Sequence, residues 1–189
     1  MTKDQLYLGT TTYGEKFSKF CEPIKQFLDL DNEAYYNINI DGGMTNIHSN
    51  YKWMEEYIAG KNYLEDPHMV HPNNIHKGFC VLLVNNYNYQ KYNDVMLYGS
   101  PNKSLFEYGF TYVLKTNVGF TAFCFTTNKS NYIINKIINE AKIIEIFIQN
   151  LDLQIKSLLQ LEKPNQSKVD LTQLKGERFF HQKGIIFYD

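Results

Sequence analysis

Residues 130 to 161 constrain the fold more than any other part of the sequence, because their apolar side chains recur every three or four residues. This spacing predicts one amphipathic helix, with Ser130 as its N-cap and Pro164 beyond its end. At about 1.5 Å per residue, the helix would be roughly 45 Å long. We expect it to pack against a sheet, or to carry a dimer contact as well. The predicted stripe is Ile134, Ile137, Ala141, Ile144, Ile148, Leu151, Ile155 and Leu158.

Two hairpins and a short apolar run predict the sheet. Residues 110–127, FTYVLKTNVGFTAFCFTT, are two β-branched and aromatic strands around a turn that contains Asn117 and Gly119. Residues 34–49, AYYNINIDGGMTNIHS, alternate around a DGG turn, which places Tyr36, Ile38 and Ile40 on one side. Residues 78–84, GFCVLLV, predict a further buried strand.

The remaining elements complete a single-domain prediction for this chain of 189 residues. Apolar spacing from Glu15 to Leu30 predicts a first helix, which Pro23 kinks or restarts. Residues 51–60 predict a second helix, and residues 162–189 predict a linker followed by a last strand or hairpin. The predicted class is α/β (α+β): an α-β-α sandwich, PAS/GAF-like, with helices on both faces of a mixed, mostly antiparallel sheet.

Charge and cysteine usage exclude several classes of protein. The sequence contains nineteen Lys and Arg, of which only Arg178 is an arginine, and twenty Asp and Glu. It therefore has no surplus of basic residues for binding the DNA backbone. No apolar run approaches the roughly 18 residues of a membrane span, and no leader pattern opens the chain. Three widely spaced cysteines within apolar runs indicate free thiols in a reducing compartment. We expect a cytoplasmic protein that neither spans a membrane nor binds DNA through these residues.

The predicted helix at residues 51–60 leads into a polar bend. On a helix, Trp53 and Tyr57 share one face. Asp66 precedes Pro67, which disfavours helical geometry and places the carboxylate at an extended bend. A buried carboxylate there must accept hydrogen bonds. Trp53 and Tyr57 are therefore either core residues or walls of a ligand pocket, and Asp66 is either a turn acceptor or a ligand contact.

In order and spacing, Trp53, Tyr57 and Asp66-Pro67 resemble the signature of the autoinducer-binding domain of LuxR-type bacterial transcriptional regulators. The order of the predicted elements agrees over residues 15–160. The resemblance implies that Tyr57 bonds an acyl carbonyl, that Asp66 accepts from the ligand amide N–H, and that Trp53 lines the head-group end. It also implies a small or polar ligand contact on the late hairpin strand, at one of Thr121, Cys124 or Thr126.

The resemblance also implies a function. Residues 1–161 would be a sensing domain that binds a small-molecule signal, forms a homodimer and regulates transcription in quorum sensing. DNA would be bound only through an attached helix-turn-helix domain, toward which residues 162–189 would lead. The sequence lacks the second Trp of the family, since that region contains FCVLLV, so we expect an apolar or amphiphilic signal rather than an acyl-homoserine lactone. Aromatic side chains would form the walls: Trp53, Phe79, Phe123 and Phe125.

Three other functions compete with the sensor. Asp66, His68, His71 and His76 have metal-ligand chemistry, but prolines interrupt the segment and we expect no metal or other cofactor. A Cys80–His76 dyad is conceivable, yet the thiol lies in an apolar run and no catalytic motif is present, so we expect no enzyme. The third alternative is a protein-interaction or effector module without a small-molecule ligand, using the Tyr-rich residues 87–98 and the long helix.

Overall fold

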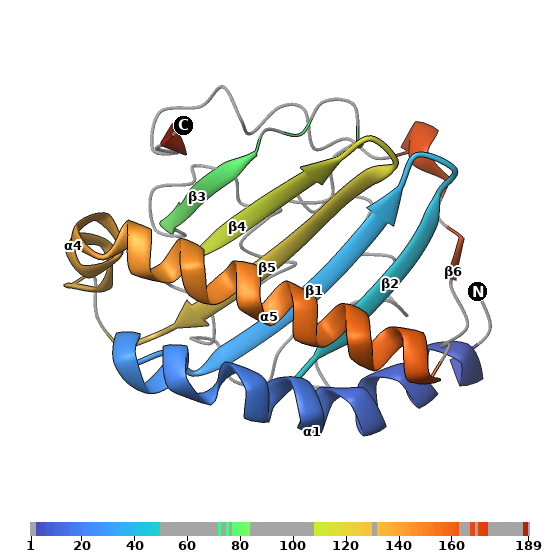
Figure 1. The fold of residues 1–189 in the computed structure, drawn as a ribbon, viewed down its shortest axis with the longest axis horizontal. Helices are drawn as coiled ribbons and strands as arrows, with labels where there is room; N and C mark the ends of the chain where they lie inside the picture. The colour runs from blue at the N-terminus through green and yellow to red at the C-terminus, as the bar shows by residue number, and fades with distance from the viewer. Residues whose placement is uncertain are drawn as a thin grey trace.

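The computed structural model describes residues 3–49, 72, 75, 77–83, 108–129, 132–162, 167–168, 170–173 and 187–188. These residues form an α+β fold in which helices pack on an antiparallel sheet, as predicted (Figure 1). The sheet order is β6-β2-β1-β5-β4-β3-β7, and every pairing between these strands is antiparallel.

The two predicted hairpins are confirmed and lie side by side. The first consists of β1 (Asn32–Asn39) and β2 (Gly43–His48), and the second of β4 (Tyr108–Thr116) and β5 (Gly119–Thr127). In the first turn Gly42 has φ 82°, and the Gly43 N–H donates to Asp41 Oδ1 at 2.9 Å. Strand β1 pairs with β5, which joins the hairpins, and the predicted strand β3 (Gly78–Leu83) pairs with β4.

Helix α1 (Lys3–Leu28) crosses one face of the sheet and begins earlier than predicted. Pro23 lies inside this helix, so the predicted restart at Pro23 does not occur. The helix ends where Asp29 adopts φ 56°, and the Leu30 N–H then donates to the Lys25 carbonyl at 2.9 Å.

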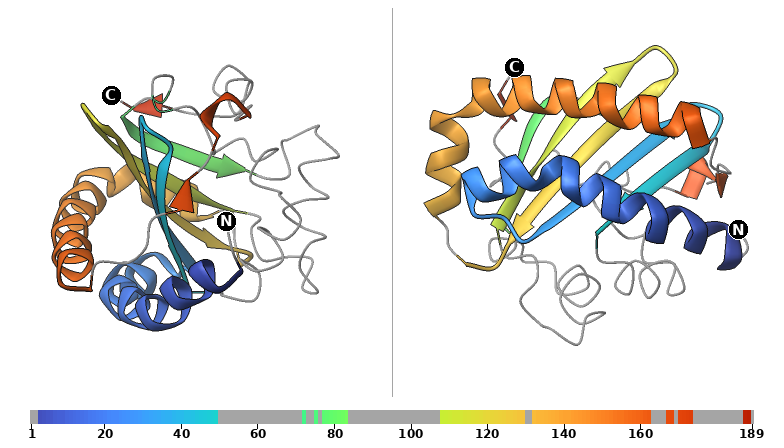
Figure 2. Two further views of the ribbon diagram at one scale, coloured as in Figure 1. Left: turned by 90° about the vertical axis from the view of Figure 1, so that its right-hand side faces the viewer. Right: turned by 60° about the horizontal axis from the view of Figure 1, so that its bottom comes forward.

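The single long helix predicted for residues 130–161 is wrong, because the helix is broken at Glu140. Its two parts are α4 (Tyr132–Asn139) and α5 (Ala141–Glu162), and Figure 2 shows them running in different directions. The Lys136 ammonium donates to the Phe27 carbonyl and lies 4.8 Å from the centre of the Phe27 ring. The bend thus holds α4 at the end of α1, while α5 runs beside α1 over the sheet.

The helices α1, α4 and α5 cover the same face of the sheet, which we call the helix face (Figure 2). Its core is aromatic: the Tyr35 and Phe123 rings meet edge to face at 5.3 Å, and Phe110 and Phe125 stack at 5.2 Å. A buried ion pair between Lys25 of α1 and Glu33 of β1 also crosses this interface.

The opposite face of the sheet, here the second face, has a separate apolar cluster. The helix predicted at residues 51–60 lies outside the described residues, so its position on this face stays a prediction. The second cluster consists of Ile38, Met44, Ile75, Val113, Phe120 and Ala122.

Residues 162–189, predicted as a linker and a last strand, contribute to both edges of the sheet. Strand β6 (Ser167–Lys168) pairs with β2, the 3-10 turn η4 (Leu171–Gln173) follows, and β7 (Phe187–Tyr188) pairs with β3. Residues 167–168 and 187–188 therefore belong to the sheet.

Candidate functional site

The residues predicted on the late hairpin strand divide between the two faces of the sheet. Side chains alternate along β5, so Thr121, Phe123 and Phe125 face the helices. Cys124 and Thr126 lie on the second face with Ala122. Thr121 and Phe123 therefore cannot line the same pocket as Cys124. Phe79, predicted as a pocket wall, also packs in the helix-face core, with Phe110 and Tyr112.

Thr121 belongs to a buried polar network between the sheet and α5. Asn37 Nδ2 donates to Thr121 Oγ1 at 3.1 Å, and the Thr121 hydroxyl also bonds the Tyr35 side chain. Burial raises the pKa of Tyr35 well above its ordinary value, and the Asp152 carboxylate adds to that rise. The network joins β1 to β5, which is a structural role for Thr121.

Cys124 lies at the centre of the second face between two hydroxyl groups. Its Sγ is 2.7 Å from the Tyr36 hydroxyl of β1 and 2.7 Å from Thr111 Oγ1 of β4. Both neighbours follow from the register, since Ala34 and Thr111 are the Cα partners of Cys124 and Tyr36 is two residues from Ala34. Neither hydroxyl is a base that would take the thiol proton, so this geometry favours hydrogen bonding over nucleophilic chemistry.

This centre is partly accessible, and its three neighbouring residues are here called the polar centre. Tyr36, Asn46 and Cys124 are partly exposed, whereas Phe120 and Ala122 are almost completely buried. Tyr36 is the register partner of Asn46 and a hydrogen-bond neighbour of Cys124.

Two further polar groups lie near the polar centre on the same face of the sheet. Thr126 is two residues from Cys124 on the same face, and its buried hydroxyl has no hydrogen-bond partner within the described part of the chain. A buried hydroxyl of this kind calls for a partner. His48, the register partner of Ala34, is 3% exposed, and burial lowers its pKa to about 3. Its imidazole is therefore neutral at physiological pH.

The polar groups at and beside the polar centre are all neutral: a phenol, a thiol, threonine hydroxyls, an amide and an imidazole. Such groups suit the carbonyl, amide or hydroxyl of an uncharged ligand, and the surrounding aliphatic cluster suits its apolar part. Tyr36 and Thr111 were missed from the sequence because only the register between the hairpins brings them to Cys124.

The other predicted contacts, Trp53, Tyr57 and Asp66, lie outside the described residues, as do the candidate metal ligands His68, His71 and His76. Within the described ranges, no three His, Cys, Asp or Glu side chains form a group that could hold a metal ion. None of the helices in those ranges combines the length and apolar character that a membrane crossing needs. No protein-family model matches the chain, and no curated protein matches it.

Proposed function

We propose that this protein is a small-molecule-sensing regulatory domain of the cytoplasm, with an apolar or amphiphilic signal bound in a hollow against the second face at Cys124. The observation that carries the proposal is the partly exposed polar centre, Tyr36, Asn46 and Cys124, beside the buried apolar side chains Phe120 and Ala122. Ligand pockets usually combine apolar walls with a few converging polar groups. The unsatisfied Thr126 hydroxyl is a further group that a ligand would bond.

Sensing would work by linkage between binding and folding. A ligand that binds only the folded state stabilises it by about 2.7 kcal/mol at a concentration one hundred times its Kd. Filling the hollow would order the groups around it and shift the population toward one conformation. In the LuxR-type form of this proposal, Trp53, Tyr57 and Asp66 complete the site, and an attached helix-turn-helix domain reports the change to DNA.

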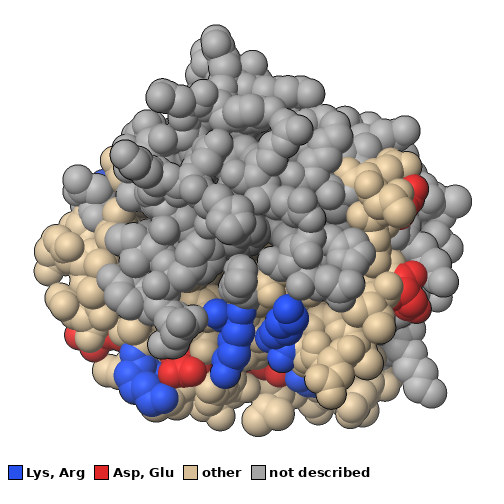
Figure 3. Space-filling view, turned by 90° about the horizontal axis from the view of Figure 1, so that it is seen from above, with Lys and Arg blue, Asp and Glu red and all other residues tan. Residues whose placement is uncertain are grey.

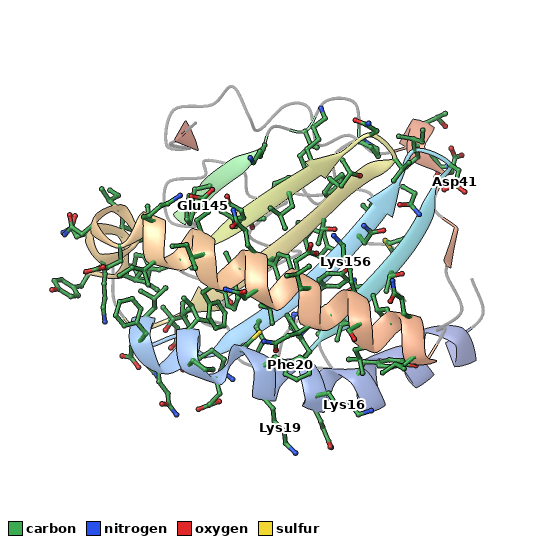
Figure 4. All side chains as sticks on the ribbon, viewed as in Figure 1. Lys16, Lys19, Phe20, Asp41, Glu145 and Lys156 are labelled. Carbon is green, nitrogen blue, oxygen red and sulfur yellow. The ribbon has the colours of Figure 1, made fainter. Side chains whose placement is uncertain are left out.

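The proposed homodimer would use an exposed apolar stripe on α5. Four side chains of this stripe are half or more exposed: Ile143, Ile146, Leu153 and Leu161. They recur at helical spacing over 18 residues, or roughly 27 Å. Two such stripes can pack antiparallel about a twofold axis. The flanking Lys142 and Lys156 are each paired within the helix, with Glu145 and Asp152, so these two lysines bring no unpaired charge to the contact. Figure 4 labels Glu145 and Lys156 on α5.

Ligand binding is tested by protection of the Cys124 thiol. Purified protein is analysed by native mass spectrometry for co-purified compounds, and by melting temperature with a panel of acyl-homoserine lactones and related amphiphiles. Alkylation by iodoacetamide is then mapped to each cysteine. A bound ligand should slow modification of Cys124. Cys21 is the control, because it is fully buried and burial raises the pKa of its thiol well above the ordinary value.

The variant Tyr36→Phe removes one hydroxyl at the hollow and should weaken the ligand-induced melting shift. Cys21→Ala removes a thiol on the helix face. It should lower the melting temperature of the free protein but leave the ligand-induced melting shift as large as in wild type. Equal ligand responses of Tyr36→Phe and wild type, together with unprotected Cys124, would place any ligand elsewhere. If no compound in the panel or the preparation binds at all, the sensor proposal fails.

The dimer is tested by sedimentation over a range of concentrations. Leu153→Glu should make the protein monomeric, whereas Val118→Glu, which changes an exposed aliphatic side chain in the β4–β5 turn, should not. The same stripe favours the second candidate function, a protein-interaction module. A wild-type protein that stays monomeric and binds no small molecule would support that alternative.

A further inference from the structure

A hollow on the helix face lies between the start of α5 and the strands β3 and β4. Its volume is about 420 Å³, within the range of small-molecule sites. It is separate from the site proposed at Cys124, because the neighbouring β4 residues Thr111 and Tyr112 point to opposite faces of the sheet. Its lining includes Lys77, Phe79, Tyr112, Ala141, Lys142 and Glu145.

The Glu145 carboxylate in this hollow already interacts with two neighbouring side chains. The Tyr112 hydroxyl donates to Glu145 Oε1 at 2.9 Å, and the Lys142 ammonium lies 3.0 Å from Oε2. Hydrogen bonds from Lys142 and Tyr112 hold the pKa of Glu145 below its ordinary value, so the group is ionised. Figure 4 shows Glu145 on the part of α5 that passes near β3. Its negative charge is therefore balanced inside the site.

Among the described residues of the lining, positive charge is in surplus. Lys77 and Lys142 contribute two ammonium groups and Glu145 one carboxylate, which leaves these residues with one net positive charge. The part of the surface seen in Figure 3 carries both lysines and acidic side chains. The wall below the rim is apolar, since Phe79 is 6% exposed and its ring meets that of Tyr112 at 4.6 Å.

From this arrangement we infer that the hollow between α5 and β3 binds a small amphiphilic carboxylate. The apolar stem of the ligand lies on Phe79 and Ala141, and its carboxylate is held by the ammonium groups of Lys77 and Lys142. Because both ammonium groups lie near the surface, the ion pairs are hydrated and each contributes modestly, while the apolar contact contributes the remainder. This inference does not depend on the ligand proposed at Cys124.

The test compares octanoate with 1-octanol, its uncharged analogue, by calorimetry and by chemical-shift titration. Octanoate should bind the wild-type protein, and Lys77→Gln should weaken its binding by about threefold to fivefold. Lys77→Gln should leave binding of 1-octanol unchanged, because the alcohol makes no ion pair. Lys19→Gln, an exposed lysine of α1 away from the site, is the matched control (Figure 4).

Blocking the hollow gives the second arm of the test. Ala141→Trp should prevent binding of both compounds, and circular dichroism checks that the variant folds. Cys124→Ala should leave octanoate binding unchanged. Failure of octanoate to bind wild type, or equal binding to wild type, Lys77→Gln and Ala141→Trp, would overturn the inference. If instead Cys124→Ala alone abolishes binding, octanoate occupies the second-face hollow, which supports the proposed sensor and overturns the inference here.

Discussion

The buried ion pair between α1 and β1 provides the sharpest test of how the helices are fixed to the sheet. The Lys25 ammonium donates to Glu33 Oε1 at 3.3 Å and lies 3.1 Å from Oε2. The Glu33 side chain is completely buried, and that of Lys25 is 16% exposed. Replacing Lys25 by Met keeps most of the side-chain volume but leaves the carboxylate buried without its cation.

The expected cost of Lys25→Met is about 3–5 kcal/mol in the free energy of unfolding, which is the usual penalty for breaking one side of a buried pair. In a chain of this size such a loss lowers Tm by roughly 10 °C. The measurement is urea unfolding followed by circular dichroism, with linear extrapolation to zero denaturant. The matched control is Lys142→Met, because Lys142 is 79% exposed and its pair with Glu145 should contribute less than about 1 kcal/mol.

A double variant separates the effect of the buried charges on stability from the effect of the packing between the two side chains. Lys25→Met with Glu33→Met replaces both ions by apolar groups of similar size, and should recover stability to within about 1 kcal/mol of wild type. Strong non-additivity between the two positions is therefore expected. If Lys25→Met alone costs no more than Lys142→Met, the reasoning is refuted, because the Glu33 carboxylate then does not need the ammonium.

Three further outcomes follow from single residues. Gly109→Ala should destabilise the protein by about 3 kcal/mol in urea unfolding, since a Cβ there would lie 2.1 Å from the Phe125 carbonyl oxygen; wild-type stability would contradict this. His48, whose pKa burial lowers to about 3, contributes stability that is present above pH 6.5 and lost as the pH falls, by about 2 kcal/mol between pH 7.5 and 5. His48→Asn should remove that part of the pH dependence, and an unchanged pH profile would show that His48 is not its source. Burial acts to raise the pKa of Asp31, but hydrogen bonds from Lys129 and its neighbours outweigh it and hold the pKa below its ordinary value. Asp31→Asn should therefore lower Tm at pH 7 but not at pH 2, and an equal Tm loss at both values would exclude an ionic contribution.

The two faces of the sheet differ in the chemistry that they offer. On the helix face, stacked rings such as Phe110 and Phe125 fill the interior. On the second face, neutral polar groups surround the partly exposed Cys124. Strand β4 reaches both sites, because Thr111 contacts Cys124 on one face while Tyr112 contacts Glu145 on the other. A ligand on either face would therefore lie next to residues of the same strand, β4.

Local features of the sequence determined the hairpins, because their signals act over a few residues. The DGG and NVG turns and the alternation of apolar residues predict β1, β2, β4 and β5, and the structure confirms them. Alternation also determined that Phe123 and Cys124 point in opposite directions. It left open which direction faces the helices, so residues of both faces were predicted for one pocket.

The break at Glu140 was not predictable from the apolar stripe. The spacing of Ile137, Ile144 and Ile148 fits one straight helix as well as two. Contacts that are distant in sequence favour the bend, since Lys136 bonds the carbonyl of Phe27, 109 positions away. Helical periodicity describes one element at a time and carries no information about such a contact.

By itself, then, the sequence determined the kinds of element, which residues of a strand share a face, and the α+β class. Only the tertiary structure decided the site, because the register between the two hairpins places Tyr36 against Cys124 across 88 positions of the chain. The physical reason is that turn and alternation signals are local, whereas the pairing of β1 with β5 depends on how both sheet faces pack.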